Sequence, residues 1–277
     1  MRIATVNVNG IRAAARKGMG EWLTASAPDI LLLQEVRADE QIAVDLLPGY
    51  ETAIWPCRIK GRAGVGVAVR EGGPATLGEL RYGVAAPGTE EPDVDSGRWL
   101  EADLSLTGFD GIERLTVISA YLHSGQLGTE KMDQKYAHLE LVDARMAELL
   151  AAARDGGSQV VMAGDLNVVR SERDIKNWKP NHNKIAGVMD EEIAHLEGWF
   201  ASGWIDVARW LAPGEQGPYT WWSQRGRAFD NNAGWRLDYQ VATPRLAKRA
   251  SAFTVDRADS HDTRWSDHAP LVVDYAF

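Results

Sequence analysis

The sequence predicts an α/β fold in which two β-sheets pack face to face with helices outside them. Short apolar strands separated by glycine turns recur along the whole chain, and helical patterns are fewer and lie between them. No linker and no internal repeat divides the chain. We therefore expect residues 1–277 to form a single domain.

Eight segments carry strand patterns. The run from Ile30 to Leu33 is wholly apolar, which is typical of a strand buried on both faces. Residues 100–106 alternate apolar and polar side chains, which indicates a strand with one face in water. The full set is residues 3–8, 30–33, 64–69, 100–106, 115–121, 159–164, 237–241 and 271–275.

Three segments are predicted to be helical. The clearest is residues 131–154, where apolar side chains recur at spacings of three and four, and Gly156 and Gly157 end the pattern. A second helix is expected over residues 191–200 and a third around Trp22. Residues 84–96 read as an acidic surface loop, with Glu90, Glu91, Asp93 and Asp95 facing away from any nucleic acid.

Composition narrows the class of protein. A chain with 45% hydrophobic and 25% charged residues is ordinary globular protein. The one cysteine, Cys57, excludes an intramolecular disulfide and favours a reducing compartment. The net charge of −9 means that nucleic acid could bind only at a local basic surface. We see neither a membrane span nor a signal peptide, and we expect a cytoplasmic protein.

Polar residues stand at the ends of several predicted strands, where α/β proteins build their sites. Taken alone, a polar residue at such a position is more often a turn residue or a helix cap. A lone histidine is more often a structural group. Together they indicate a functional site. They are Asn7, Glu35, Tyr121, Asp165, Asn167, Asp238, Asp267 and His268.

Four of these residues are carboxylates, Glu35, Asp165, Asp238 and Asp267, and they need a cation if they converge. Oxygen ligands without cysteine or clustered histidine favour Mg²⁺, with Mn²⁺ as a substitute. The sequence has no zinc-protease motif and no phosphate-binding P-loop. A hard metal with a histidine, amides and a tyrosine suits hydrolysis of a phosphoester.

Nine motifs in order give the chain a family resemblance. It resembles the exodeoxyribonuclease III and AP endonuclease branch of the endonuclease/exonuclease/phosphatase superfamily. The matching segments are NVNGIRAA (7–14), LLQEVRA (32–38), GVGVAV (64–69), AYLHSG (120–125), GDLNV (164–168), DIKN (174–177), YTWWS (219–223), GWRLDY (234–239) and SDHAP (266–270). The resemblance implies a four-layer α/β sandwich.

The resemblance also implies a role for each site residue. Glu35 would be the main metal ligand, with Asn7 beside it and Asp267 near the metal. Asp165 would align or deprotonate the attacking water, and Asn167 would orient the site. His268, held by Asp238, would bind the scissile phosphate. Tyr121 would donate a hydrogen bond to the phosphate or act as a phenolate.

The substrate that this resemblance implies is duplex DNA with an abasic site, cut on the 5′ side of the lesion. Degradation of strands from 3′ to 5′ and removal of 3′-blocking groups would accompany it. An abasic sugar leaves the helix cheaply because it has no base to unstack. Trp221, Trp235 and Leu237 would form its pocket, although core packing is the other interpretation of the tryptophans. We expect contacts to the DNA from Asn177, Arg12 and Lys135. We also expect a monomer that acts on DNA of a bacterial-type nucleoid.

The chain departs from the family pattern at three positions. Val6 stands where tryptophan is usual, His123 where proline is usual, and Val188 where an aromatic residue is common. His123 could affect how Tyr121 is held or add a titratable group near the phosphate. Two rival functions remain: a phosphodiesterase or phosphatase acting on a non-DNA phosphoester, and a catalytically silent DNA-binding protein of the same fold.

Overall fold

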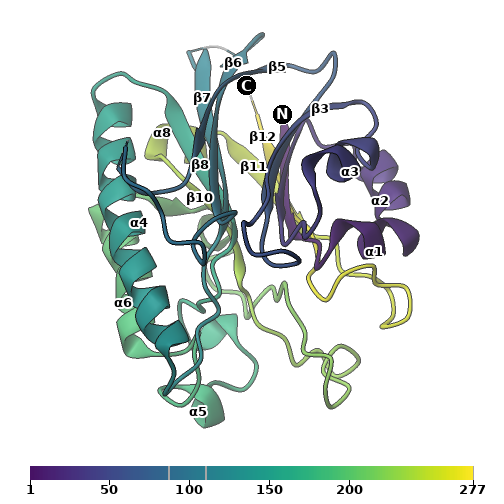
Figure 1. Cartoon of the computed structure of the whole chain (residues 1–277), viewed down its shortest axis with the longest axis vertical. Coiled ribbons are helices and arrows are strands. Elements are labelled where there is room, and N and C mark those ends of the chain that lie inside the picture. Colours follow the sequence, from purple (N-terminus) through teal and green to yellow (C-terminus); the bar gives the residue numbers. More distant parts are fainter. Residues whose placement is uncertain (87, 110, 277) are drawn as a thin grey trace.

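Two six-stranded mixed sheets form the middle of the molecule in a computed structural model that describes residues 1–86, 88–109 and 111–276 (Figure 1). The first sheet has the order β11-β12-β1-β2-β4-β3. Its strands are β1 (Arg2–Asn7), β2 (Ile30–Gln34), β3 (Tyr50–Trp55), β4 (Val65–Arg70), β11 (Ala250–Val255) and β12 (Leu271–Tyr275). The second sheet has the order β5-β6-β7-β8-β10-β9. Its strands are β5 (Ala75–Tyr82), β6 (Trp99–Leu106), β7 (Arg114–Tyr121), β8 (Gln159–Asp165), β9 (Ile205–Asp206) and β10 (Asp238–Ala242).

Helices cover the outer faces of both sheets, which gives the four layers that the sequence predicts (Figure 1). α1 (Ile11–Arg16), α2 (Met19–Ser26) and α3 (Glu40–Asp45) lie on one side, and α4 (Glu130–Arg154) and α6 (Asp190–Ser202) on the other. The shorter helices are the 3₁₀ turn η1 (Glu172–Asp174), α5 (Trp178–Asn181), α7 (Val207–Leu211) and α8 (Pro244–Ala247). Within the described ranges, no helix has the length and apolar character needed to cross a membrane.

The main core lies between the sheets. Ile3, Leu32 and Val67 of the first sheet belong to one buried cluster with Val117 and Val161 of the second. A second cluster joins the second sheet to α4 and α6, and a third joins the first sheet to α1, α2 and α3. Burial on both faces explains why the central strands are almost continuously apolar.

The strand directions bring the site residues to one end of the molecule. β1 is parallel to β2, and β7 is parallel to β8, so Glu35, Tyr121 and Asp165 all stand at or just beyond carboxyl ends. β10 is antiparallel to β8, with Asp238 directly opposite Asp165. β12 is antiparallel to β1, so the segment before it reaches the same end.

All eight predicted strands and the three predicted helices are present, with bounds shifted by a few residues at most. The sequence patterns missed β3, β5, β9 and β11, which stand at the edges of the two sheets. The acidic loop prediction for residues 84–96 is partly wrong, and residue 87 lies outside the described residues. Glu91 is buried and accepts backbone hydrogen bonds from Val84 and Ala85, and Asp95 is buried against His123.

Candidate active site

Glu35 is the centre of a hydrogen-bond cluster at the carboxyl ends of β1, β2 and β7. Its Oε1 accepts a hydrogen bond from the Tyr121 hydroxyl at 2.5 Å and one from Asn7 Nδ2 at 3.1 Å. Its Oε2 pairs with the guanidinium of Arg37. Asn7 Nδ2 also donates to Asp165 at 2.9 Å, so one amide group hydrogen-bonds to both carboxylates. Burial, together with the charges of Glu35 and Asp165, raises the pKa of Tyr121 well above its ordinary value, which favours a phenol that donates.

A buried histidine lies between two carboxylates. His268 Nδ1 is 2.8 Å from Asp238 Oδ2, and His268 Nε2 is 3.6 Å from Asp165 Oδ2. Burial opposes a charge on the imidazole, but Asp238 and Asp165 raise its pKa to about 10. Burial raises the pKa of Asp165 to about 7, with the charge of His268 opposing it. The imidazolium is therefore placed to attract an anion, and Asp165 is a carboxylate whose pKa suits proton transfer near neutral pH.

Asp267 is held at the mouth of the site by two neighbours. Asn9 Nδ2 donates to one of its oxygens at 2.9 Å, and Trp221 Nε1 donates to the other at 3.2 Å. Burial opposes ionisation, but the charge of His268 and these hydrogen bonds lower the pKa of Asp267. Asp267 therefore adds a fixed negative charge beside Glu35 and Asp165, with which it lines one cavity.

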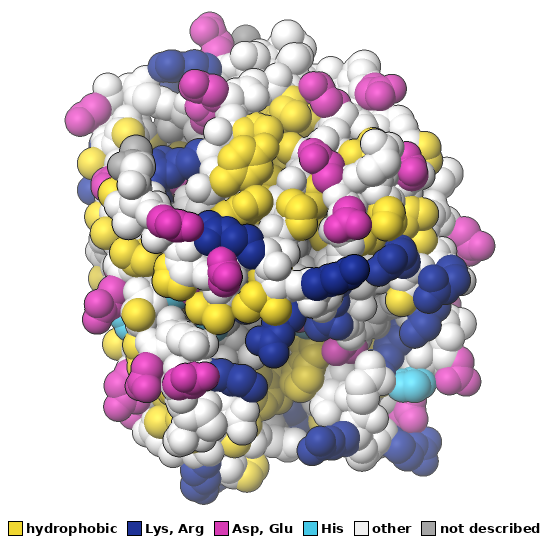
Figure 2. Space-filling model, viewed as in Figure 1, with side chains coloured by type: hydrophobic (Ala, Val, Ile, Leu, Met, Phe, Trp, Pro, Cys, Tyr) yellow, Lys and Arg dark blue, Asp and Glu magenta, His cyan; other side chains and the backbone are white. Residues whose placement is uncertain are grey.

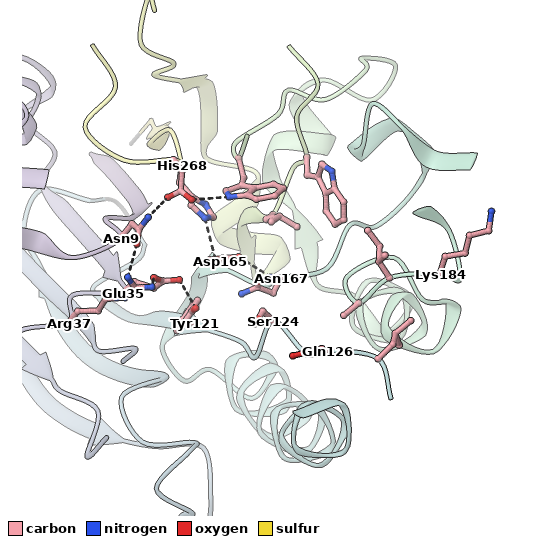
Figure 3. Close-up of a pocket in the computed structure, with 18 residues that line it drawn as sticks. Asn9, Glu35, Arg37, Tyr121, Ser124, Gln126, Asp165, Asn167, Lys184 and His268 are labelled. Atoms are coloured by element: carbon pink, nitrogen blue, oxygen red, sulfur yellow. Dashed lines mark hydrogen bonds and ion pairs between the residues drawn. The ribbon is translucent and has the colours of Figure 1, made fainter. Parts of the chain in front are cut away.

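That cavity has a volume of about 720 Å³ and one apolar wall. The wall is made by Trp221, Trp235 and Leu237, and the two indole rings meet edge to face with centroids 5.6 Å apart. Both tryptophans are half-buried, and their backbones exchange two hydrogen bonds of 2.9 Å. In Figure 3 Glu35, Arg37 and Tyr121 occupy one side of the cavity, and Gln126 and Lys184 lie toward the other. Ionic groups and a hydrophobic wall thus share one opening.

Basic side chains gather around this end of the molecule. Figure 2 shows Lys and Arg over the middle and lower part of the face, around a hollow. Arg12 and Asn177 are exposed, but neither lines the cavity. The expectation that Lys135 contacts DNA is wrong, because its side chain is fully buried and its Nζ lies 2.5 Å from Glu192 Oε1. Arg236 is likewise buried, between Asp174 and Asp206.

Comparison with known proteins places the chain in a family. The model of the Endonuclease/Exonuclease/phosphatase family matches residues 4–268. The chain belongs to this family. It is 32% identical to an exodeoxyribonuclease of Bacillus subtilis (strain 168), with 98% of each chain covered. It is 29% identical to a DNA-(apurinic or apyrimidinic site) endonuclease of Dictyostelium discoideum, covering 99% of this chain and 70% of that one. A solved AP endonuclease from Archaeoglobus fulgidus superposes with a TM-score of 0.81 at 25% identity, with both chains fully covered.

The three departures from the family pattern do not remove any group from the cavity. Val6 is buried in the core beneath the first sheet, and Val188 packs in a small cluster with Leu237. His123 is outside the cavity lining: its Nε2 is 2.6 Å from Asp95, and its ring meets His138 edge to face. His123 therefore links the loop after β7 to the acidic loop of residues 84–96. It does not line the cavity that holds Glu35, Asp165 and Asp267.

Sequence reasoning missed three residues that fix the site. Arg37 neutralises Glu35 and donates to Asn9 at 2.8 Å. Asn9 in turn holds Asp267. Thr220 Oγ1 accepts from the backbone of Leu237 and Asp238, both at 3.0 Å, which fixes the start of β10. All three residues lie inside motifs that the sequence analysis identified, within two positions of predicted site residues.

The donor set fits the hard cation that this enzyme family implies. Among the described residues, no three acidic, histidine or cysteine side chains form a ready-made metal cage. A Mg²⁺ site does not need such a cage, because the ion keeps several waters and binds through one or two carboxylates. Glu35 lines the cavity beside Asp267, and both offer oxygen. Asn7 turns its amide nitrogen to Glu35, while its oxygen accepts from Asn9 N at 3.0 Å, so here Asn7 positions Glu35.

Proposed function

We propose that the protein is a Mg²⁺-dependent DNA-repair nuclease that hydrolyses the phosphodiester on the 5′ side of abasic sites in duplex DNA. Mn²⁺ would substitute for Mg²⁺, and 3′–5′ exodeoxyribonuclease and 3′-end-cleaning activities would accompany it. One observation carries the proposal: the apolar wall of Trp221, Trp235 and Leu237 borders the same cavity as Glu35 and His268. The names of the relatives from Bacillus and Dictyostelium support both nuclease activities.

The proposed chemistry assigns a task to each polar group. Glu35, with Asp267 nearby, would hold the metal, which would supply positive charge to the transition state. His268 and Tyr121 would donate hydrogen bonds to the scissile phosphate, where negative charge develops. Asp165 would orient the attacking water and accept its proton. Asn167 fixes Asp165 through a backbone N–H that donates to its Oδ1 at 3.0 Å.

Recognition of the lesion would follow from the shape and polarity of the cavity. An abasic sugar turned out of the helix would pack against the indoles, and a nucleotide that keeps its base costs more to turn out. Arg12, Asn177 and the other exposed basic residues would contact phosphates along the duplex. We further propose that residues 1–277 act as one domain and as a monomer. We also propose a cytoplasmic location, which fits the free thiol of Cys57.

The decisive test uses a labelled duplex with a single tetrahydrofuran abasic analogue. The protein is incubated with it in Mg²⁺ and in EDTA, beside a Glu35→Gln variant. We expect metal-dependent incision 5′ to the lesion, lost in the variant. Calorimetric titration with Mg²⁺ and Mn²⁺ gives the second readout, because Glu35→Gln should weaken metal binding while exposed Glu21→Gln should not. No incision by a folded, metal-binding protein would overturn the proposal and favour a non-DNA phosphoester, and no metal binding would favour a silent scaffold.

A further inference from the structure

Lys135 and Glu192 form a fully buried ion pair beneath the loops that line the cavity. Lys135 lies on α4 and Glu192 on α6, and both side chains are 0% exposed. Their charged atoms are 2.5 Å apart. Burying two charges is costly unless further hydrogen bonds satisfy the ammonium protons and carboxylate lone pairs that the ion pair does not use. One of those further bonds caps α6, and the others go to loops that line the cavity.

The ammonium of Lys135 contacts two of these loops. It donates to the backbone oxygen of Asn167 at 2.9 Å and approaches that of Ser124 at 3.5 Å. Gly125 packs on the same side chain: a Cβ there would stand 3.1 Å from Lys135 Cδ and 3.3 Å from the Cβ of Ala186. Ser124, Gly125 and Asn167 all line the cavity. The lysine therefore fastens the loop after β7 to the loop after β8.

The carboxylate of Glu192 fastens a third loop. Its Oε2 accepts hydrogen bonds from the backbone N–H of Gly187 at 2.6 Å and of Met189 at 3.0 Å. Met189 is the N-cap residue of α6, so the second bond caps the helix that carries Glu192, and the bond from Gly187 is the one that holds the loop. Gly187 follows Ile185 and Ala186, which line the cavity. A Cβ on Gly187 would stand 2.9 Å from the Asn167 oxygen and 3.3 Å from the Trp235 ring. The third loop is thus held against both the second loop and the tryptophan wall.

We propose that the Lys135–Glu192 ion pair is a positioning device that sets the width of the lesion pocket by fixing three loops (residues 122–128, 166–169 and 184–189). This inference rests on the proposed function, because the pocket matters only if it takes an abasic sugar. Among the described residues, Glu35, Asp238 and His268 form no hydrogen bond or ion pair with Lys135 or Glu192. Asp165 is linked to the pair only through Asn167, whose backbone oxygen accepts from Lys135 and whose N–H donates to Asp165. The pair should therefore govern the fit of the lesion more than the chemical step, since small misplacements of a bound group can cost about 10²-fold.

The test compares Lys135→Met with two matched variants. Lys135→Arg keeps the charge, and Arg145→Met breaks another ion pair of α4, between Arg145 and Glu101, whose closest atoms are 2.7 Å apart. We expect Lys135→Met to raise KM for the tetrahydrofuran duplex at least tenfold, with a smaller change in kcat that Asn167 would transmit to Asp165. Binding of intact duplex in EDTA should stay the same. Arg145→Met should lower Tm without moving KM, and Lys135→Arg should recover at least part of the loss.

A second readout needs no DNA. Hydrogen exchange at the amides of Gly187 and Met189, which donate to Glu192, should quicken at least tenfold in Lys135→Met and stay unchanged in Arg145→Met. If Lys135→Met does not fold, Lys135→Met with Glu192→Met removes both charges and is measured in its place. Unchanged KM and unchanged exchange would overturn the inference and leave an ordinary buried pair. A wild-type protein that leaves abasic DNA uncut would overturn the proposed function instead, and exchange would still decide whether the pair fixes the loops.

Discussion

Nδ1 of His268 lies 2.8 Å from Oδ2 of Asp238, and both side chains are buried. Asp238 opens β10 of the second sheet, whereas His268 precedes β12 of the first, so this contact joins the two sheets across the site. A carboxylate at this position orients the imidazole and stabilises its charged form. The imidazolium can then keep its other N–H directed toward Asp165 and toward an anion that enters the cavity.

Replacing Asp238 by Asn should remove most of that stabilisation while keeping the shape of the side chain. We expect the pKa of His268 to fall from about 10 toward its ordinary value, because Asp238 raises it most. At pH 8 the imidazole would then be neutral, and kcat/KM for incision should fall roughly 10²–10³-fold. NMR titration of His268 and single-turnover rates measure both effects. Asp95→Asn is the control, since Asp95 pairs with His123 outside the cavity, and a His268 that still titrates near 10 in Asp238→Asn would contradict the assignment.

The pH dependence of the rate should report Asp165. A base must lose its proton to act, and burial raises the pKa of Asp165 to about 7. The rate should therefore rise with pH below 7, by up to about tenfold per unit, and level off above it. Asp165→Asn should lose roughly 10²–10⁴ in rate, keep its affinity for DNA and lose this slope. A slope that persists in the residual activity of Asp165→Asn would assign the titration to another group.

Strand-end placement is what made much of this site predictable. Glu35, Tyr121 and Asp165 each stand at or just beyond the carboxyl end of a strand whose apolar pattern is visible in the sequence. Parallel pairing of β7 and β8 brings the ends that carry Tyr121 and Asp165 together in the second sheet. Glu35 follows β2 of the first sheet, and only the packing of the two sheets face to face brings it to Tyr121. The edge strands β3, β5, β9 and β11 could not be predicted in this way. β5 is buried only at Ala75, and β11 has no buried position, so neither strand shows a period-two apolar pattern.

The burial of two cationic side chains, Lys135 and Arg236, could not be predicted from the sequence for a different reason. Lys135 was predicted to contact DNA, and Arg236 lies in the motif GWRLDY, but the groups that neutralise them lie far along the chain. Glu192 follows Lys135 by 57 positions, and Asp174 precedes Arg236 by 62. Only the packing of α6 on α4, and of η1 beside β10, brings these charges together. A basic residue next to a motif is therefore weak evidence for contact with DNA.

Trp235 should distinguish lesion recognition from general DNA binding. It lines the cavity and packs edge to face on Trp221. Trp235→Ala should lower kcat/KM for the tetrahydrofuran duplex more than tenfold, because the sugar loses its apolar wall, while affinity for intact duplex changes less than threefold. Trp210→Ala is the matched control, since Trp210 is exposed on α7 and does not line the cavity. Equal losses on both DNAs would make Trp235 a packing residue.

Arg236 supports the same wall from inside the protein. Its Nε lies 2.6 Å from Asp174, and its two terminal nitrogens lie 3.0 and 2.8 Å from Asp206. Arg236→Met should lower the free energy of unfolding by about 3–5 kcal/mol, because it leaves two buried carboxylates without this partner. Arg225→Met, at an exposed position of the preceding loop, should change it by about 0.5 kcal/mol or less. Urea denaturation of both variants measures the difference. A loss below about 1 kcal/mol in Arg236→Met would mean that Arg209, which also pairs with Asp174, carries the cluster without it.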